Sequence, residues 1–389
     1  MNLNMEIEQL FPQLTEDCVD FACRLIQTPS MPGEEQAIAE LITAEMERLQ
    51  FDRVWMDQIG NVYGRVFGKD RDLPALVLNT HLDHVDPGDP DIWPVPPYSA
   101  TIVDGRIVGR GASDIKGPLA VQVYGMAGLI RSGTRPQRDV VFTGVVEEEV
   151  GGAGAVHWIE NLDYPVALVV LGEPSSNDLS LGHRGMLAVW VTFHGRSVHA
   201  SVPQKGNNPN YALADFLGRL KTAQVELRNH ELLGKTTVAP TIIEVDTKSQ
   251  NVTPAWTRVL LDFRTSVESP RSLKEFISRV AGDLPHAITA GYATQPVMDS
   301  DEPLGGYYTP PESPAVQKSL ALLRQGMGRE PRLISYHFAT DGRHFVGHDI
   351  PIIGYSPAEE DQAHIAGESI SISQMEESLR GHLELLAGY

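Results

Sequence analysis

The spacing of apolar positions divides the first half of the chain into alternating helices and strands. Residues 14–27 and 34–49 repeat apolar side chains with the period of an amphipathic helix, and a helix rich in small residues is expected at 117–132. Four short apolar runs are typical of buried strands, at 62–67, 75–79, 140–146 and 166–171. This alternation predicts an α/β fold with a mixed, mostly parallel sheet flanked by helices.

The pattern changes after residue 183. Strands are expected at 187–193, 238–245, 256–263 and 286–293, with helices at 208–224 and 269–281. The order βαββαβ is that of a ferredoxin-like unit. We therefore predict a main domain built from residues 1–183 and 298–389, with an inserted domain at 184–297.

Composition limits the class of protein. The 389 residues suffice for two domains, and a hydrophobic fraction of 42% suits a globular chain. A net charge of −20 disfavours nucleic acid and anionic membrane surfaces as partners. No apolar run approaches the ~18 residues of a membrane span, and the N-terminus lacks the features of a secretory signal. Cys18 and Cys23 lie in a helical pattern, which favours buried thiols in the cytoplasm.

Acidic and imidazole side chains recur at His81, Asp83, Asp114, Glu147, Glu148, Glu149, Glu173 and His364. Most of them follow an apolar run or a glycine-rich turn, whereas His364 lies in an irregular acidic stretch. Because an α/β sheet delivers such side chains into a crevice at its carboxyl edge, we expect them to converge. Two imidazoles and at least three carboxylates in one crevice suit a pair of divalent metal ions.

The local chemistry of each motif is consistent with such a site. His81 and Asp83 are two apart at a strand end and point to the same side, and a metal-bound His commonly donates its other N–H to a carboxylate. Asp114 lies in a glycine-rich turn, where one carboxylate can bridge two cations ~3.5–4 Å apart. Glu148 and Glu149 follow an apolar strand; neighbours on a strand would face opposite sides, one towards metal and one towards substrate.

Each motif taken alone also has a structural explanation. Asp114 could cap the helix that follows it, and the glutamates could lie at a solvated helix N-terminus. His81, His199 and His364 could each be an ordinary structural or surface histidine. The joint pattern, rather than any single residue, favours the metal site.

The order of these motifs around an inserted βαββαβ unit resembles the M20 metallopeptidase family. That family includes acetylornithine deacetylase, succinyl-diaminopimelate desuccinylase, aminoacylase and glutamate carboxypeptidase. The resemblance implies that His81 and Glu173 hold one zinc ion, that Glu149 and His364 hold another, and that Asp114 bridges them. Carboxylate-rich sites of this kind also accept Co²⁺ or Mn²⁺.

The resemblance also implies catalytic roles. Asp83 would orient His81, and Glu148 would be the general base that takes a proton from a water between the metals and passes it to the leaving amine. His199 would stabilise the oxyanion. Positions in the inserted lid that contact substrate in relatives are matched by Arg184, Asn251 and Arg264. The lid would also form a homodimer.

Three positions depart from the family pattern. Glu147 replaces the usual aspartate before the two glutamates, and His84, Val85 and Asp86 follow the His-x-Asp motif where an apolar pair and proline are common. Phe338-Ala339 replaces a glycine-rich turn before Thr340-Asp341-Gly342-Arg343.

We expect a metal-dependent hydrolase that cleaves the amide bond of an N-acyl amino acid or similar small substrate. A dipeptidase or carboxypeptidase would use the same catalytic residues. A two-metal phosphoesterase would also need an acidic site, but no basic or glycine-rich phosphate cradle is evident. A non-enzymatic binding protein is disfavoured by the complete ligand set.

Overall fold

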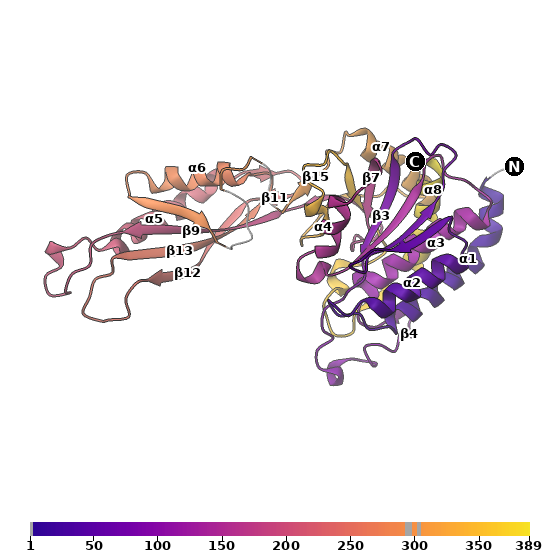
Figure 1. The fold of residues 1–389 in the computed structure, drawn as a ribbon, viewed down its shortest axis with the longest axis horizontal. Coiled ribbons are helices and arrows are strands. Elements are labelled where there is room, and N and C mark those ends of the chain that lie inside the picture. Colours follow the sequence, from indigo (N-terminus) through magenta and orange to yellow (C-terminus); the bar gives the residue numbers. More distant parts are fainter. Residues whose placement is uncertain (1–2, 292–297, 302–304) are drawn as a thin grey trace. The chain divides into compact units, whose positions relative to one another are not determined.

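The computed structural model describes residues 3–291, 298–301 and 305–389. The chain forms two compact units (Figure 1), the first comprising Met1–Gly182, Tyr308–Tyr336 and Thr340–Tyr389 and the second His183–Tyr307 and His337–Ala339. The predicted boundary after residue 183 lies one residue from the division at Gly182. The predicted end of the inserted domain, residue 297, lies outside the described residues, so these limits stay a prediction.

One mixed sheet organises the first unit. In the described part of the chain its order is β1-β2-β6-β3-β7-β17-β8-β15, with β16 beside β8. The strands are β1 (Arg53–Met56), β2 (Val62–Val66), β3 (Ala75–His81), β6 (Val140–Val145), β7 (Val166–Leu171), β8 (Leu179–His183), β15 (Tyr307–Tyr308), β16 (Leu333–Tyr336) and β17 (Ile352–Gly354). β6, β3, β7 and β17 pair in parallel, whereas β1 with β2, β2 with β6 and β17 with β8 are antiparallel.

Helices cover this sheet. They are α1 (Leu3–Ile26), α2 (Gln36–Arg48), α3 (Gly117–Arg131), α4 (Ala153–Glu160), α7 (Pro314–Met327) and α8 (Ile372–Gly388). The small residues of α3 permit close packing, because a Cβ at Gly125 or Gly128 would press on His382 or Leu383 of α8. All residues of β3 and β6 are buried. A small sheet of β4 (Thr101–Val103), β5 (Arg106–Val108) and β18 (Ser369–Ser371) joins distant parts of the sequence.

The second unit has the predicted βαββαβ order. Its elements are β9 (Gly185–His194), α5 (Pro209–Ala223), β12 (Thr237–Val245), β13 (Trp256–Thr265), α6 (Pro270–Ala281) and β14 (His286–Ala290), with a short hairpin of β10 (Asn229–His230) and β11 (Gly234–Lys235). The antiparallel order β12-β13-β9-β14 leaves β12 at an edge (Figure 1). Both helices begin at a side-chain cap followed by proline, Asn208-Pro209 and Ser269-Pro270. Their apolar faces share one core with β9 and β13.

The predicted fold class, a mixed α/β sheet with helices and an inserted ferredoxin-like unit, is confirmed. Among the described residues, no helix combines the length and apolarity needed to cross a membrane.

Candidate metal centre

The first half of the centre lies at the carboxyl ends of β3 and β7. In the parallel register Asn79 lies opposite Leu171, so His81, at the end of β3, and Glu173, two residues after β7, emerge at the same edge. His81 Nε2 lies 3.1 Å from Asp114 Oδ1 and 4.0 Å from Glu173 Oε1. All three residues are buried.

The second half forms on the other oxygen of Asp114. His364 Nε2 lies 3.1 Å from Asp114 Oδ2 and 3.1 Å from Glu149 Oε1. The backbone of His364 is left-handed, with φ 61°. Each carboxylate oxygen of Asp114 therefore faces one imidazole, and each imidazole has one glutamate beside it. Ligand atoms of His81, Asp114 and Glu149 lie within 4.8 Å of one another.

Glu368 fixes the turn that carries Asp114. Its Oε1 accepts the backbone N–H groups of Ser113 and Asp114, each at 2.9 Å. Its Oε2 accepts the N–H of Gly111 at 2.9 Å and Arg110 Nη1 at 2.5 Å. The glycine is required at position 111, where φ is +78°. The sequence analysis missed Glu368, whose only signal was an acid between a glycine and an alternating strand.

Asp83 has a second role that the sequence analysis did not foresee. His81 Nδ1 lies 3.0 Å from the Asp83 carbonyl oxygen and 3.3 Å from its Oδ1. Asp83 Oδ1 and Oδ2 also accept the backbone N–H groups of Glu148 and Glu149, at 3.1 and 3.0 Å. One carboxylate thus positions both the imidazole of His81 and the turn that carries the glutamates.

The three glutamates do not extend β6, so the expectation of strand alternation is wrong. β6 ends at Val145, Glu147 has a left-handed φ of 58°, and Glu148–Val150 form a 3₁₀ turn. The backbone N–H of Glu147 donates to the buried Glu35 carboxylate at 3.1 Å. The backbone N–H groups of Glu148 and Glu149 donate to the Asp83 carboxylate. These amides therefore need no strand partner.

Glu148 lies beside a second charged group that the sequence analysis did not identify as functional. Arg343 Nη2 lies 3.7 Å from Glu148 Oε1. Burial raises the pKa of Glu148 well above its usual range, and the buried Asp341 adds to the rise, whereas His81 and Arg343 oppose it. A carboxyl group with a raised pKa suits proton transfer near neutral pH. The sequence analysis mentioned Thr340-Asp341-Gly342-Arg343 only because the segment before it differs from the family pattern.

Comparison with known proteins identifies the family. The sequence profile of peptidase family M20/M25/M40 matches residues 77–388. The chain belongs to this family. It is 27% identical to succinyl-diaminopimelate desuccinylase 2 of Ruegeria sp. (strain TM1040) over 92% of this chain and 91% of the relative. It is therefore a metal-dependent hydrolase, as the resemblance predicted.

Solved structures share the fold. Aminopeptidase PepT from Bacillus cereus superposes with a TM-score of 0.73 at 18% identity, over 96% of this chain and 98% of that chain. The YXEP protein of Bacillus subtilis, described as a dinuclear metal-binding peptidase of the M20 family, superposes with a TM-score of 0.69 at 13% identity, over 97% and 100% of the two chains.

The charges at the centre of this M20 protein suit divalent cations. Burial would lower the pKa of His81, but its contacts with Asp114 and Asp83 raise it well above the usual value. Contacts with Asp114 and Glu149 raise the pKa of His364 to about 10. The carboxylates therefore stabilise the positively charged form of both imidazoles, at the two places where a metal ion would lie. Imidazole nitrogens and carboxylate oxygens are donors that zinc accepts.

The four predicted lid residues fall into two groups within the second unit. His199 is exposed, and its Nδ1 lies 2.8 Å from Ser201 Oγ. Asn251 lies close by, because its carbonyl oxygen accepts the backbone N–H of Ala200 at 2.8 Å. His199 follows the end of β9, and Asn251 precedes the start of β13.

The other two residues lie at the opposite end of the same strands. Arg184 immediately precedes β9 and lies 3.4 Å from the Lys235 carbonyl, whereas Arg264 is opposite Met186 and pairs with Asp262 at 2.9 Å. The length of β9, ten residues, separates the groups by roughly 30 Å. The unit does not bring the four residues together.

Proposed function

We propose that this M20 protein is a dinuclear metal amidohydrolase that cleaves the amide bond of an N-acyl amino acid or a similar small substrate. The two-sided arrangement around Asp114 carries the proposal. Each oxygen lies 3.1 Å from a different imidazole nitrogen, which is the arrangement expected of a carboxylate shared by two ions.

His81 and Glu173 would hold one ion and Glu149 and His364 the other, with Asp114 between them. Two zinc ions, or Co²⁺ or Mn²⁺, would lower the pKa of a water and polarise the substrate carbonyl when bound. Asp83 contributes by keeping the Nδ1 proton of His81 directed at its own oxygens, so that Nε2 offers its lone pair to the centre.

Glu148 is the proposed general base. Its raised pKa allows it to take a proton from the attacking water and then to protonate the leaving amine nitrogen. Arg343, 3.7 Å away, favours the charged form before the transfer. His199 is proposed to stabilise the oxyanion, and Arg184, Asn251 and Arg264 to contact the substrate.

A homodimer through the second unit is part of the proposal. The roughly 30 Å between the two groups of lid residues is too long for one small substrate to contact both in a single chain. A second copy would supply the missing group. Edge strand β12 offers the surface, because Ile242, Ile243 and Val245 are 46%, 57% and 40% exposed. The free thiols of Cys18 and Cys23 support a cytoplasmic location.

A substrate panel tests the proposed activity. N-acetyl and N-succinyl amino acids would be run beside dipeptides and a phosphomonoester on metal-reconstituted protein, with metal content measured in parallel. We expect about two ions per chain and turnover of an N-acyl amino acid. Turnover of dipeptides alone would favour the peptidase alternative, and phosphomonoester turnover would contradict both.

The substitution Glu148→Gln tests the base. We expect kcat to fall at least about a thousandfold with unchanged metal content, because the amide cannot accept the proton. Glu147→Gln is the matched control on the same turn and should leave kcat within about threefold. Full activity in Glu148→Gln would contradict the assignment.

A further inference from the structure

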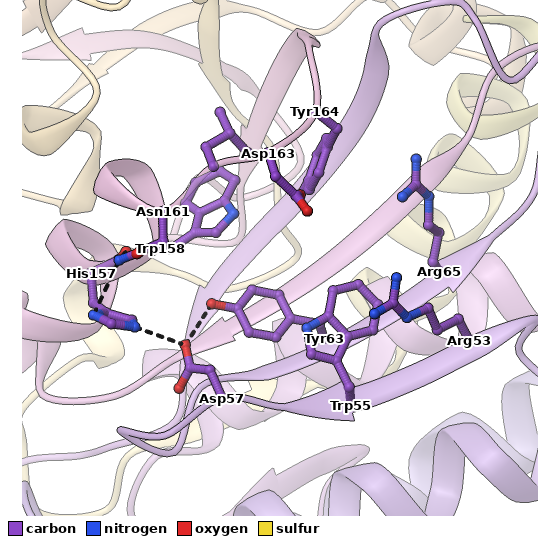
Figure 2. A pocket seen from close by; sticks show the side chains of 11 residues that line it. Arg53, Trp55, Asp57, Tyr63, Arg65, His157, Trp158, Asn161, Asp163 and Tyr164 are labelled. Carbon is purple, nitrogen blue, oxygen red and sulfur yellow. Dashed lines mark hydrogen bonds and ion pairs between the residues drawn. The ribbon is translucent and has the colours of Figure 1, made fainter.

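A separate pocket of about 180 Å³ lies in the first unit (Figure 2). Side chains of β1 and β2 form one wall, and α4 with the turn that follows it forms the other. None of the candidate metal ligands lines this pocket. Its volume is below that of a drug-sized ligand site, so an occupant would be about as large as one substituted ring.

Flat aromatic surfaces line the pocket. Trp55 stacks on Tyr63, with ring centroids 4.9 Å apart and planes inclined by 11°. Tyr164 lies on the opposite wall, as Figure 2 shows. Because Tyr63 covers one face of Trp55 and Arg53 lies over the ring as well, Tyr63 and Tyr164 are the rings that favour a planar group in the pocket.

Positive charge lies at one end of the pocket. The Arg53 guanidinium lies 4.5 Å from the centroid of the Trp55 ring and, within the described residues, has no carboxylate partner. Arg65 lies 5.1 Å from the Tyr164 ring and is already paired with the buried Asp139 at 2.6 Å. Arg53 therefore supplies the uncompensated charge, and its planar fork matches a carboxylate.

The acidic side chains do not offer a cation site. Asp57 Oδ1 accepts three backbone N–H groups of its own loop at 3.0–3.1 Å. Its Oδ2 accepts Asn61 Nδ2 at 3.0 Å and Tyr63 Oη at 2.8 Å, and it lies 3.8 Å from His157 Nε2; the contacts with Tyr63 and His157 are drawn in Figure 2. Both oxygens of Asp57 therefore already accept hydrogen bonds, and one of these bonds positions Tyr63. Asp163 lines the pocket and is exposed, and its negative charge would repel a bound anion.

Two donors in the wall are buried and do not contribute to ligand preference. Trp158 Nε1 and Tyr164 Oη are inaccessible to an occupant, and the Tyr164 hydroxyl lies close to the side chains of Trp158 and Thr143. Burial raises the pKa of Tyr164 to about 12, although the nearby Trp158 and Arg65 oppose the rise, so the phenol keeps its proton.

We infer that this pocket binds a small planar aromatic carboxylate. The ring would lie between Tyr63 and Tyr164, and the carboxylate would accept hydrogen bonds from Arg53. The inference does not depend on the proposed function, because the pocket and the metal centre share no residue.

Calorimetry on the metal-loaded protein tests the inference with three probes: benzoate, the neutral benzamide and the non-planar cyclohexanecarboxylate. We expect benzoate to bind at least about tenfold more tightly than either of the others, because only benzoate combines charge and planarity. Hydrogen exchange should slow at residues 53–65 and 157–164 when benzoate is added. Equal binding of the three probes, or protection confined to residues near His81 and Asp114, would overturn the inference.

Single substitutions separate this pocket from anion binding at the metals. Arg53→Ala should weaken benzoate binding by about tenfold, and Asp163→Asn should strengthen it about two- to threefold. Arg71→Ala is the matched control, since Arg71 also stacks on an aromatic ring, Phe67 at 3.8 Å, but does not line the pocket. Unchanged binding in Arg53→Ala, or equal loss in Arg71→Ala, would refute the assignment.

Discussion

At the scale of single residues, the centre depends on carboxylates that position other groups rather than bind metal. Asp83 accepts hydrogen bonds from Glu148 and Glu149 and lies against His81 Nδ1, while Glu368 accepts four N–H groups around Asp114. Both are fully buried. Since a small displacement of a ligand weakens a metal site, these residues are as important to test as the ligands.

Replacing Asp83 by Asn should weaken metal binding by about 10–100-fold, because the amide keeps one acceptor where the carboxylate has two. Competition with a chromophoric chelator measures this. Asp57→Asn is the control, since Asp57 also accepts backbone N–H groups but lies in a different loop. Equal metal affinity in wild type and Asp83→Asn would contradict the role of Asp83.

Glu368→Gln should lower the free energy of unfolding by about 2–4 kcal/mol, because a buried NH₂ group would then face N–H donors that have lost their acceptor. Urea unfolding measures the change. Glu359→Gln is the comparison, because Glu359 is only half-buried. Among the described residues, Arg106 is the one charged side chain that pairs with Glu359. A loss below about 0.5 kcal/mol in Glu368→Gln would argue against this role.

Most candidate ligands were recognisable because they follow apolar runs or a glycine-rich turn, whereas His364 lies in an irregular acidic stretch and was identified through the family resemblance. The sequence analysis did not identify Glu368, Asp341 or Arg343. Their importance comes from contacts with segments more than a hundred residues away, such as the 254 residues between Asp114 and Glu368. No local pattern encodes such a contact.

At the scale of elements, α1, α2 and α3 meet at one buried carboxylate. Glu45 of α2 accepts Arg48 at 2.6 Å, Tyr124 of α3 at 2.6 Å and Arg24 of α1 at 2.8 Å. Burial alone would raise the pKa of Glu45, but these hydrogen bonds lower it from 4.5 to about 2. The charged form of Glu45 therefore links three helices.

Because the folded pKa of Glu45 lies below the unfolded value, its contribution is complete above pH 4.5 and is lost as the pH falls towards 2. Glu45→Gln should cost about 2–3 kcal/mol at pH 7 and little near pH 2. Urea unfolding of wild type and variant across this range gives the difference. Glu40→Gln, exposed on the same helix, should show no such dependence. A constant difference would refute the linkage.

Most elements were predictable because their apolar spacing was regular. β7 was predicted with its observed bounds, Val166–Leu171, since it is a continuous apolar run. β1 was missed because Arg53–Met56 is partly exposed at the sheet edge and lacks such a run. The glutamate turn was misjudged because its shape is set by Asp83 and Glu35, which are distant in the sequence.

At the scale of the whole molecule, the proposed homodimer through β12 is the hypothesis to test. Ile243→Lys should convert the dimer to a monomer, because a charge on an exposed apolar edge opposes pairing. Sedimentation measures the mass, and metal content should be unchanged while kcat falls. Val225→Lys is the control, since Val225 is 76% exposed in the same unit but outside β12. A monomeric wild type would contradict the proposal.

The chain order of the candidate ligands has a consequence for biosynthesis. His81 is made early, whereas His364 is made after the whole second unit, and β17 must still insert between β7 and β8. A ribosome-bound chain that stops before residue 364 therefore carries four of the five candidate ligands and lacks the imidazole beside Glu149. Stable capture of the second ion would then await residue 364, and a shorter nascent chain could hold at most the ion beside His81.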